Sequence, residues 1–372
     1  MVTPFSIPHY GARRLPFTGG LRGWVFCLSV ATLCFTSGPA VSCAFDMVKP
    51  EQTTIDWIVG SETLVLARPS DENPFVFNVT QILAGDDEGP PIDQLVDSAS
   101  RRTLAAHPTD AVLFAHSIDN GWRRVAYVDE GFHGILRTAL DHRHAWQDSM
   151  PQSRLKFITA LQDSSVPAHK YVVIGELDKV PYSVLRTLDI RVSDKDLLRD
   201  LWSRTGYPYQ ATRALLLGLS GTHAARAEIH DYINRVTDWD WANNLGAFAA
   251  AYIELEGAAG VEHLATSMLL DANQPIDKIE QIVMAMSVHH GIGDQRLKTS
   301  IQDSIDTLIT QRPSAGVVVA RQFSLRSDWS QFTVLEPLVT KRSVGLSDLL
   351  TISVYVARAR ESSAIAAGNV YE

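Results

Sequence analysis

Residues 211–236 read ATRALLLGLSGTHAARAEIHDYINRV: an apolar segment, a glycine turn and a more polar segment. Residues 211–219 are apolar nearly all round, apart from Arg213, so a helix formed by them must be buried between neighbours. After Gly221, charged and apolar residues interleave over 224–236, as in a helix with one exposed face. A single unit cannot bury both sides of its first helix. The stretch therefore predicts that several helix pairs stack together.

The same unit recurs along the chain. Further apolar segments of helical length lie at 246–255, 279–288 and 315–325. The turns that follow align at Gly221, Gly257, Gly291 or Gly293, and Ser327-Asp328, with spacings of 36, then 34 or 36, then again 34 or 36 residues. Self-similarity at a period of about 35 residues is typical of stacked helix pairs. An earlier pair is predicted from Arg154 to Val180, with its turn at Asp163-Ser164.

In period and pattern, residues 152–360 resemble the HEAT and armadillo class of α-helical repeat proteins. The resemblance implies an α-helical solenoid of HEAT-like helix pairs. It also implies an extended surface that binds a protein partner.

The region upstream of the repeats has strand spacing. Residues 64–67 form a short apolar run, and residues 75–80 alternate as strand residues do. A second strand pair is expected at 111–115 and 122–128, because Asp119-Asn120-Gly121 between them is a tight-turn signal of a hairpin. Residues 92–105 have room for one short helix. We predict a small β-rich domain, a barrel or a sandwich.

The order of Glu62–Ala67, Phe75–Leu83, a loop and Ala111–Ala115 resembles the OB-type domain of netrin-module and metalloproteinase-inhibitor proteins, over residues 54–147. Those relatives use an N-terminal cysteine and several disulfides, which this chain lacks, so their inhibitory mechanism does not carry over. The predicted class is α+β multidomain. It comprises an OB-like β-rich domain (43–150), an α-helical repeat domain (151–360) and a flexible C-terminal tail (361–372).

The first 42 residues have the pattern of a signal peptide. They carry three arginines and no acidic residue, then an apolar run from Trp24 to Phe35 and a small-residue exit. Ala40 and Ser42 occupy the −3 and −1 positions for a cut before Cys43, and a cut two residues later is also allowed. The apolar run is too short to cross a bilayer of about 30 Å. We expect export to the periplasm or outer envelope, with a permanent N-terminal anchor as the alternative.

Residues 40–43, Ala-Val-Ser-Cys, resemble the lipoprotein signal in which the cysteine becomes lipid-modified, with Ala40 in place of the usual Leu. The resemblance implies an alternative in which Cys43 tethers an envelope lipoprotein to the membrane.

Charge and cysteine content restrict the partners. Without residues 1–42, the chain holds 30 basic and 42 acidic residues, a formal net charge of −12. Such an acidic protein is a poor partner for nucleic acid or for anionic membrane surfaces. The cysteines lie only at positions 27, 34 and 43, so the exported chain cannot form an internal disulfide. Packing alone must stabilise it.

The string Asp238-Trp239-Asp240-Trp241 alternates two carboxylates with two indoles. Aromatic faces pack on sugar rings, and paired carboxylates perform glycoside hydrolysis. The string therefore predicts, as an alternative function, a carbohydrate-binding protein or a glycoside-acting enzyme. The competing interpretation is structural. The string lies between two predicted helices, where an aspartate caps the next helix and a tryptophan fills the junction.

Two histidine pairs are candidate metal ligands. On a strand, His142 and His144 would share a face and reach one ion, although no third ligand lies nearby in the sequence. The alternative is a solvated polar segment. His289 and His290 precede a predicted turn, and neighbours on a helix point about 100° apart. We expect them to cap the helix end rather than to chelate a metal.

The sequence contains no P-loop, no zinc-protease helix motif, no dinucleotide fingerprint and no G-x-S-x-G string. We therefore name no catalytic residue and no cofactor. The predicted function is that of an exported, non-enzymatic protein-interaction or scaffolding protein whose partner is another protein of the cell envelope.

Overall fold

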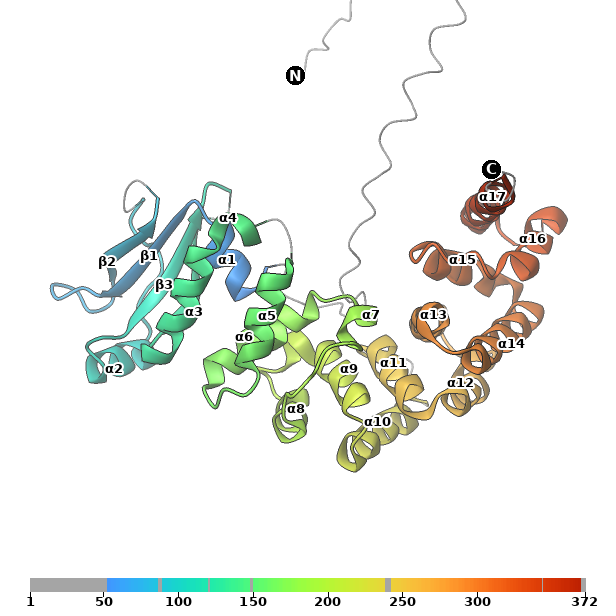
Figure 1. The fold of residues 1–372 in the computed structure, drawn as a ribbon, viewed down its shortest axis with the longest axis horizontal. Helices are drawn as coiled ribbons and strands as arrows, with labels where there is room; N and C mark the ends of the chain where they lie inside the picture. Colours follow the sequence, from blue (N-terminus) through green and yellow to red (C-terminus); the bar gives the residue numbers. More distant parts are fainter. Residues whose placement is uncertain are drawn as a thin grey trace, which may run out of the picture. The chain divides into compact units, whose positions relative to one another are not determined.

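The computed structural model describes residues 52–85, 89–119, 121–147, 150–237, 242–342 and 344–368, which all belong to one compact unit. Within these residues a four-stranded antiparallel sheet is followed by a long succession of helices (Figure 1). The predicted α+β class is confirmed at this level. The predicted signal peptide, Cys43 and the string 238–241 lie outside the described residues.

The sheet is built from four antiparallel strands in the order β2-β1-β3-β4. They are β1 (Thr63–Pro69), β2 (Phe77–Ala84), β3 (Ala111–Ser117) and β4 (Gly121–Val128). β3 and β4 pair from Ala111 opposite Val128 to Ser117 opposite Gly121, so the predicted hairpin is confirmed. Helix α1 (Thr54–Gly60) precedes the sheet, and α2 (Ser98–Ala106) is the short helix predicted between the strand pairs.

Helices cover both faces of this sheet. Leu64 and Leu113 share a core with α1 and α3 (Glu130–Asp141), whereas Val65 and Phe114 share a second core with Leu104 of α2. The period-2 alternation of a strand sends neighbouring residues into these different cores. β2 and β4 are the edge strands. The described strands form one open sheet, and the predicted barrel or sandwich is not confirmed.

Three helices connect the sheet to the rest of the chain: α4 (Arg143–Trp146), α5 (Gln152–Leu161) and α6 (Pro167–Asp178). α5 and α6 occupy the first predicted helix pair. One hydrophobic cluster extends from Ile55 of α1 to Val356 near the C-terminus. The boundary predicted near residue 150 therefore separates a mixed region from an all-helical one, but it does not separate two cores.

The remaining elements are all helical. The first of them are α7 (Tyr182–Leu185), α8 (Asp194–Leu201), the 3-10 turn η1 (Tyr207–Tyr209), α9 (Gln210–Ser220), α10 (His223–Val236), α11 (Leu245–Glu256), α12 (Ala258–Leu264) and the π-helix η2 (Ala265–Leu269). They are followed by α13 (Ile276–Ile292), α14 (Gln295–Gln311), the 3-10 turn η3 (Pro313–Ala315), α15 (Gly316–Ser324), α16 (Phe332–Lys341) and α17 (Leu346–Gly368).

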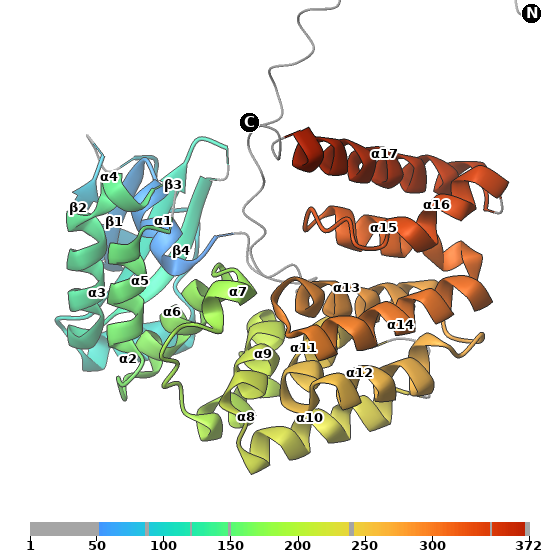
Figure 2. The same cartoon turned by 45° about the vertical axis from the view of Figure 1, so that its right-hand side comes forward.

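Alternate helices contact one another in chain order. α9 contacts α11, which contacts α13, then α15 and α17, and the intervening helices α12, α14 and α16 contact in the same order (Figure 2). Every residue of α9 from Gln210 to Gly218 is buried, as is every residue of α11 from Leu245 to Ile253. The apolar segments therefore form the buried helices, as their pattern predicts.

Glycines allow the tight turns and the close packing of this region. Gly221 and Gly257 end α9 and α11 with φ values of 63° and 60°, a region that other residues rarely adopt. At Gly218, α9 packs closely against α11. A Cβ there would lie 2.7 Å from the Cα of Ala251, so only glycine fits without moving a backbone.

The C-terminal helix is longer than the sequence predicts. α17 continues to Gly368, beyond residue 361, where the flexible tail was expected to start. The alanines at positions 364, 366 and 367 explain the difference, since alanine favours helix. Among the described helices, none combines the length and apolar character that a membrane span needs.

Candidate functional site

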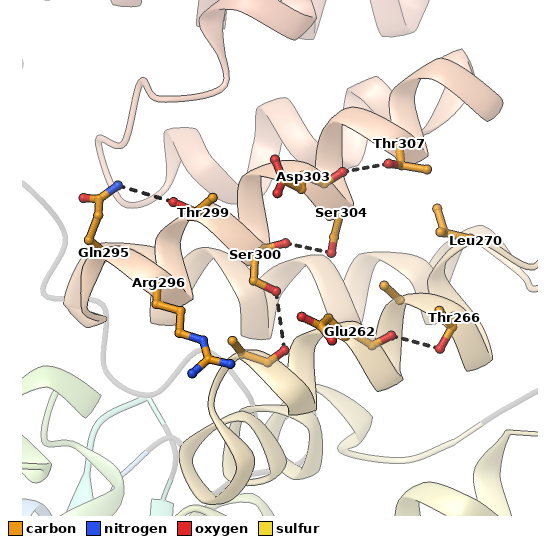
Figure 3. Close-up of a pocket in the computed structure, with 12 residues that line it drawn as sticks. Glu262, Thr266, Leu270, Gln295, Arg296, Thr299, Ser300, Asp303, Ser304 and Thr307 are labelled. Atoms are coloured by element: carbon orange, nitrogen blue, oxygen red, sulfur yellow. Dashed lines mark hydrogen bonds between the residues drawn. The ribbon is translucent and has the colours of Figure 1, made fainter.

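A groove of about 530 Å³ lies between α12 and α14. One side is formed by α12 and η2, and the other by α14 (Figure 3). The groove is lined by Ala258, Glu262, Ala265, Thr266, Leu270, Gln295, Arg296, Thr299, Ser300, Asp303, Ser304 and Thr307.

The α14 side of the groove follows from helical spacing. Arg296, Ser300, Asp303 and Thr307 recur every three or four residues and therefore share one face of the helix. The N-cap of α14 is Asp294, whose carboxylate accepts the backbone N–H of Leu297 at 2.8 Å. The capped helix holds this row of polar side chains along its whole length.

The opposite side contains an irregular turn. Leu270 donates its backbone N–H to the carbonyl of Ala265 at 3.0 Å, an i to i+5 bond typical of a π-helix. Such a turn inserts one residue and changes which side chains share a face, and π-turns are frequent at functional sites. Here Ala265, Thr266 and Leu270 all line the groove together with Glu262.

Four of the five hydroxyls that line the groove donate to backbone carbonyls, whereas that of Thr299 accepts from Gln295. Thr266 donates to the carbonyl of Glu262 at 2.9 Å, and Ser304 donates to the carbonyl of Ser300 at 2.8 Å. Ser300 in turn donates across the groove to the carbonyl of Ala258 at 3.4 Å. A hydroxyl that donates to its own helix keeps its lone pairs as acceptors. The engaged hydroxyls and the carboxylates of Glu262 and Asp303 therefore present acceptors, and Arg296 is the one cationic donor of the lining.

Three charged side chains line the groove: Glu262, Asp303 and Arg296. All three are exposed, and none makes an ion pair or a side-chain hydrogen bond within the described part of the chain. Their sum is one negative charge. An acceptor-rich surface with a net negative charge favours a ligand that supplies hydrogen-bond donors and positive charge.

A second polar cluster joins the sheet region to the helices and is buried. The guanidinium of Arg154 donates to both carboxylate oxygens of Glu176, at 2.7 and 2.8 Å, and to Asp56 at 2.8 Å. Lys179 donates to both oxygens of Asp56 at 2.7 Å, and the hydroxyl of Thr53 donates to Glu176. These residues come from α1, α5 and α6 and from the segments next to them. The cluster ties three elements together rather than lining a cavity.

The charges of this cluster sustain one another. Burial alone would raise the pKa of Asp56, but hydrogen bonds from Lys179 and from the backbone of Thr53, with the attraction of Arg154, hold that pKa below its usual value. Burial alone would lower the pKa of Arg154, but the hydrogen bonds and the charge of Glu176 outweigh the effect of burial and raise that pKa. Asp56 and Arg154 are therefore held in their charged forms. Sequence alone shows one sign of the cluster, because Thr53 and Asp56 have the spacing of a capping box.

The sequence led us to expect that His289 and His290 cap the C-terminal end of α13. Their side chains do not do so. His289 is fully buried and lies 2.9 Å from the carbonyl of Ala250 in α11. His290 turns the other way and lies 2.6 Å from the carboxylate of Asp328. The expectation was wrong because both rings point sideways to neighbouring segments. The two imidazoles therefore link three successive parts of the helical region.

The other histidine pair does not have the strand geometry that metal binding required. His142 is the cap residue between α3 and α4, and His144 belongs to α4, so the two do not lie on a strand that would place them on one face. The ring of His142 stacks on Trp146, with a centroid distance of 4.8 Å. Among the described residues, no group of three potential ligands is arranged to hold a metal ion.

The carbohydrate candidates Asp238, Trp239, Asp240 and Trp241 and the lipidation candidate Cys43 lie outside the described residues, so they stay predictions. Comparisons with protein-family models, with curated proteins and with solved structures gave no significant match.

Proposed function

We propose that this chain is an exported, non-enzymatic protein that binds a protein partner of the cell envelope through its helical region. The observation that carries the proposal is the groove between α12 and α14, in which Glu262 and Asp303 have no ion-pair partner among the described residues. We infer that the groove receives a basic, extended segment of the partner.

We also infer that α9 to α17 form an α-solenoid of HEAT-like helix pairs. The chain-order contacts of α9, α11, α13, α15 and α17 and the burial of the first helices support it. In a solenoid each pair contacts only its neighbours, which leaves the second helices free to form a binding surface. The inference does not extend to an OB-like barrel, because the described strands form an open sheet.

The size of the groove suits a short peptide segment. Its α14 side runs from Gln295 to Thr307, which at 1.5 Å per residue is about 18 Å. An extended chain rises about 3.3 Å per residue, so about five residues fill this length. Lysine or arginine side chains in such a segment would pair with Glu262 and Asp303, and their N–H groups would bond the hydroxyl lone pairs.

A peptide experiment tests the groove directly. A fluorescein-labelled hexapeptide of alternating lysine and serine is titrated with the protein and followed by fluorescence anisotropy. We expect binding that weakens as salt is added, because exposed charges are screened. The variant Glu262→Gln/Asp303→Asn should bind several-fold more weakly, since each exposed charge pair contributes about 0.2–1 kcal/mol.

The matched control removes two carboxylates elsewhere. Asp306 lies on α14 but not in the groove, and Asp231 lies on α10. If Asp306→Asn/Asp231→Asn weakens the peptide as much as the groove variant does, only net charge matters and the groove proposal is rejected. A glutamate-serine peptide that binds equally well would reject it too.

Capture from an envelope extract then tests whether the groove selects a partner. We expect proteins retained by the unmodified chain to be lost with Glu262→Gln/Asp303→Asn and kept with Asp306→Asn/Asp231→Asn. A set of captured proteins that is the same for both variants would contradict the proposal.

Export is tested separately by mass spectrometry of the mature N-terminus. We expect an N-terminus at Cys43 or two residues later. An added diacylglycerol mass on Cys43 would favour the lipoprotein alternative, in which the same binding surface is held at a membrane. Retention of residues 1–42 in the envelope fraction would reject cleavage and support the permanent anchor.

A further inference from the structure

A second cavity, of about 400 Å³, lies between α6, α8 and the start of α9. It is separate from the groove between α12 and α14 and shares no residue with it. Its walls combine a charged side with an apolar side. The charged side is formed by Lys170, Asp196, Arg199, Asp200 and Arg213.

The two carboxylates of the cavity already have cationic partners. Asp196 accepts from Lys170 at 2.6 Å and from Arg199 at 2.7 Å. Asp200 accepts from Arg199 through both of its oxygens at 2.8 Å. These four residues are balanced in charge, so the excess positive charge of the cavity belongs to Arg213.

Arg213 is buried and short of partners. The residue is only 5% exposed. Within the described residues, its guanidinium makes a single hydrogen bond, to the carbonyl of Gly206 at 2.7 Å. A guanidinium has five N–H donors. Burial lowers the pKa of Arg213 below its usual value, and the attraction of Asp200 only partly offsets this effect. A buried cation in this state gains from an anion that enters the cavity.

The apolar side of the cavity is formed by Tyr171, Ile174 and Leu197. Tyr171 is 42% exposed, so its ring is accessible to a ligand, whereas Ile174 and Leu197 are buried. A neighbouring cavity of about 340 Å³ shares Lys170 and Asp196 with the first and adds room along the same wall.

We propose that this cavity binds a small organic carboxylate with an apolar body. The carboxylate pairs with the guanidinium fork of Arg213, and the apolar body lies against Tyr171, Ile174 and Leu197. The single excess charge of the cavity favours one negative charge on the ligand. The volume lies within the range of about 300–1,000 Å³ that small-molecule sites occupy.

Isothermal titration calorimetry on the full chain tests the proposal with 3-phenylpropanoate. Three further probes separate its parts: acetate has only the carboxylate, 3-phenylpropanol has only the apolar body, and inorganic phosphate has more charge and no body. We expect 3-phenylpropanoate to bind more tightly than each of the other three. Equal binding of phosphate or acetate, equal binding of the alcohol, or no binding of 3-phenylpropanoate would overturn the proposal.

Two variants place the ligand. Arg213→Met removes the charge at similar volume and should weaken 3-phenylpropanoate at least about tenfold, whereas Arg213→Lys should weaken it less. The control Arg321→Met removes a charge from the exposed surface of α15 and should leave the affinity unchanged. If Arg213→Met does not fold, Tyr171→Ala takes its place, because that side chain is exposed and the change leaves the charged side of the cavity intact. Unchanged affinity in Arg213→Met, or in Tyr171→Ala where it is used, would refute the site.

Discussion

Replacement of Arg154 by methionine should destabilise the protein strongly, because it leaves a buried negative charge. Glu176 is not exposed at all and accepts two of its hydrogen bonds from Arg154. After Arg154→Met it would keep, among the described residues, only the hydroxyl of Thr53 as a donor. Asp56 would lose less, since Lys179 still donates to both of its oxygens. The cost therefore falls mainly on Glu176.

Its magnitude follows from the burial. Removing one partner of a buried ion pair costs about 3–5 kcal/mol, against a total stability of about 5–15 kcal/mol for an ordinary domain. The double variant Arg154→Met/Glu176→Met removes both charges of this buried pair. It should lose only about 1–3 kcal/mol of stability. This cost arises because groups such as the Trp146 carbonyl, which accepts from Arg154 at 3.1 Å, lose their partner. The double variant should thus be more stable than the single one.

The assay is urea unfolding followed by far-UV circular dichroism, with hydrogen–deuterium exchange of peptides from α5 and α6. We expect faster exchange in both helices for Arg154→Met and partial recovery in the double variant. The surface control Arg321→Met removes an exposed ion pair with Glu280 and should change stability by less than about 1 kcal/mol. A loss below about 1 kcal/mol for Arg154→Met, or a double variant no more stable than the single one, would refute the reasoning.

Three further predictions concern the helical region. Burial lowers the pKa of His289 to about 4. Between about pH 6.5 and 4 the unfolded chain therefore binds a proton that the folded chain does not. The free energy of unfolding should fall on acidification through this range, by at most about 3 kcal/mol. His289→Gln should flatten this part of the stability–pH curve, and an unchanged slope would contradict the assignment. Gly218→Ala should cost about 1–3 kcal/mol in urea unfolding, because the added methyl meets Ala251, whereas Gly291→Ala, with open space around it, should not destabilise. Asp294→Ala should remove the N-cap of α14, cost about 1 kcal/mol and speed hydrogen exchange in its first turn, while Asp294→Asn should not.

The helices and strands that were predicted from the sequence depend on residues close together in the chain. The turn at 119–121 sits between two alternating segments, so the β3–β4 hairpin needs no distant information. The segments 211–219 and 246–255 are apolar apart from a few residues such as Arg213 and Glu254, which favoured buried helices at α9 and α11. Gly221 and Gly257 end those helices because their positive φ values suit only glycine well.

Only the tertiary structure decided which polar groups meet. Arg154 and Asp56 are 98 residues apart, and His289 reaches Ala250 over 39 residues, separations that periodicity does not resolve. The polar face of α14 is visible in the sequence, but the groove exists only because α12 and its π-turn pack beside it. Local propensities act over a few residues, whereas a site depends on the contacts that burial of the whole core selects. The physical reason is that helix and turn preferences are encoded locally, and packing partners are not.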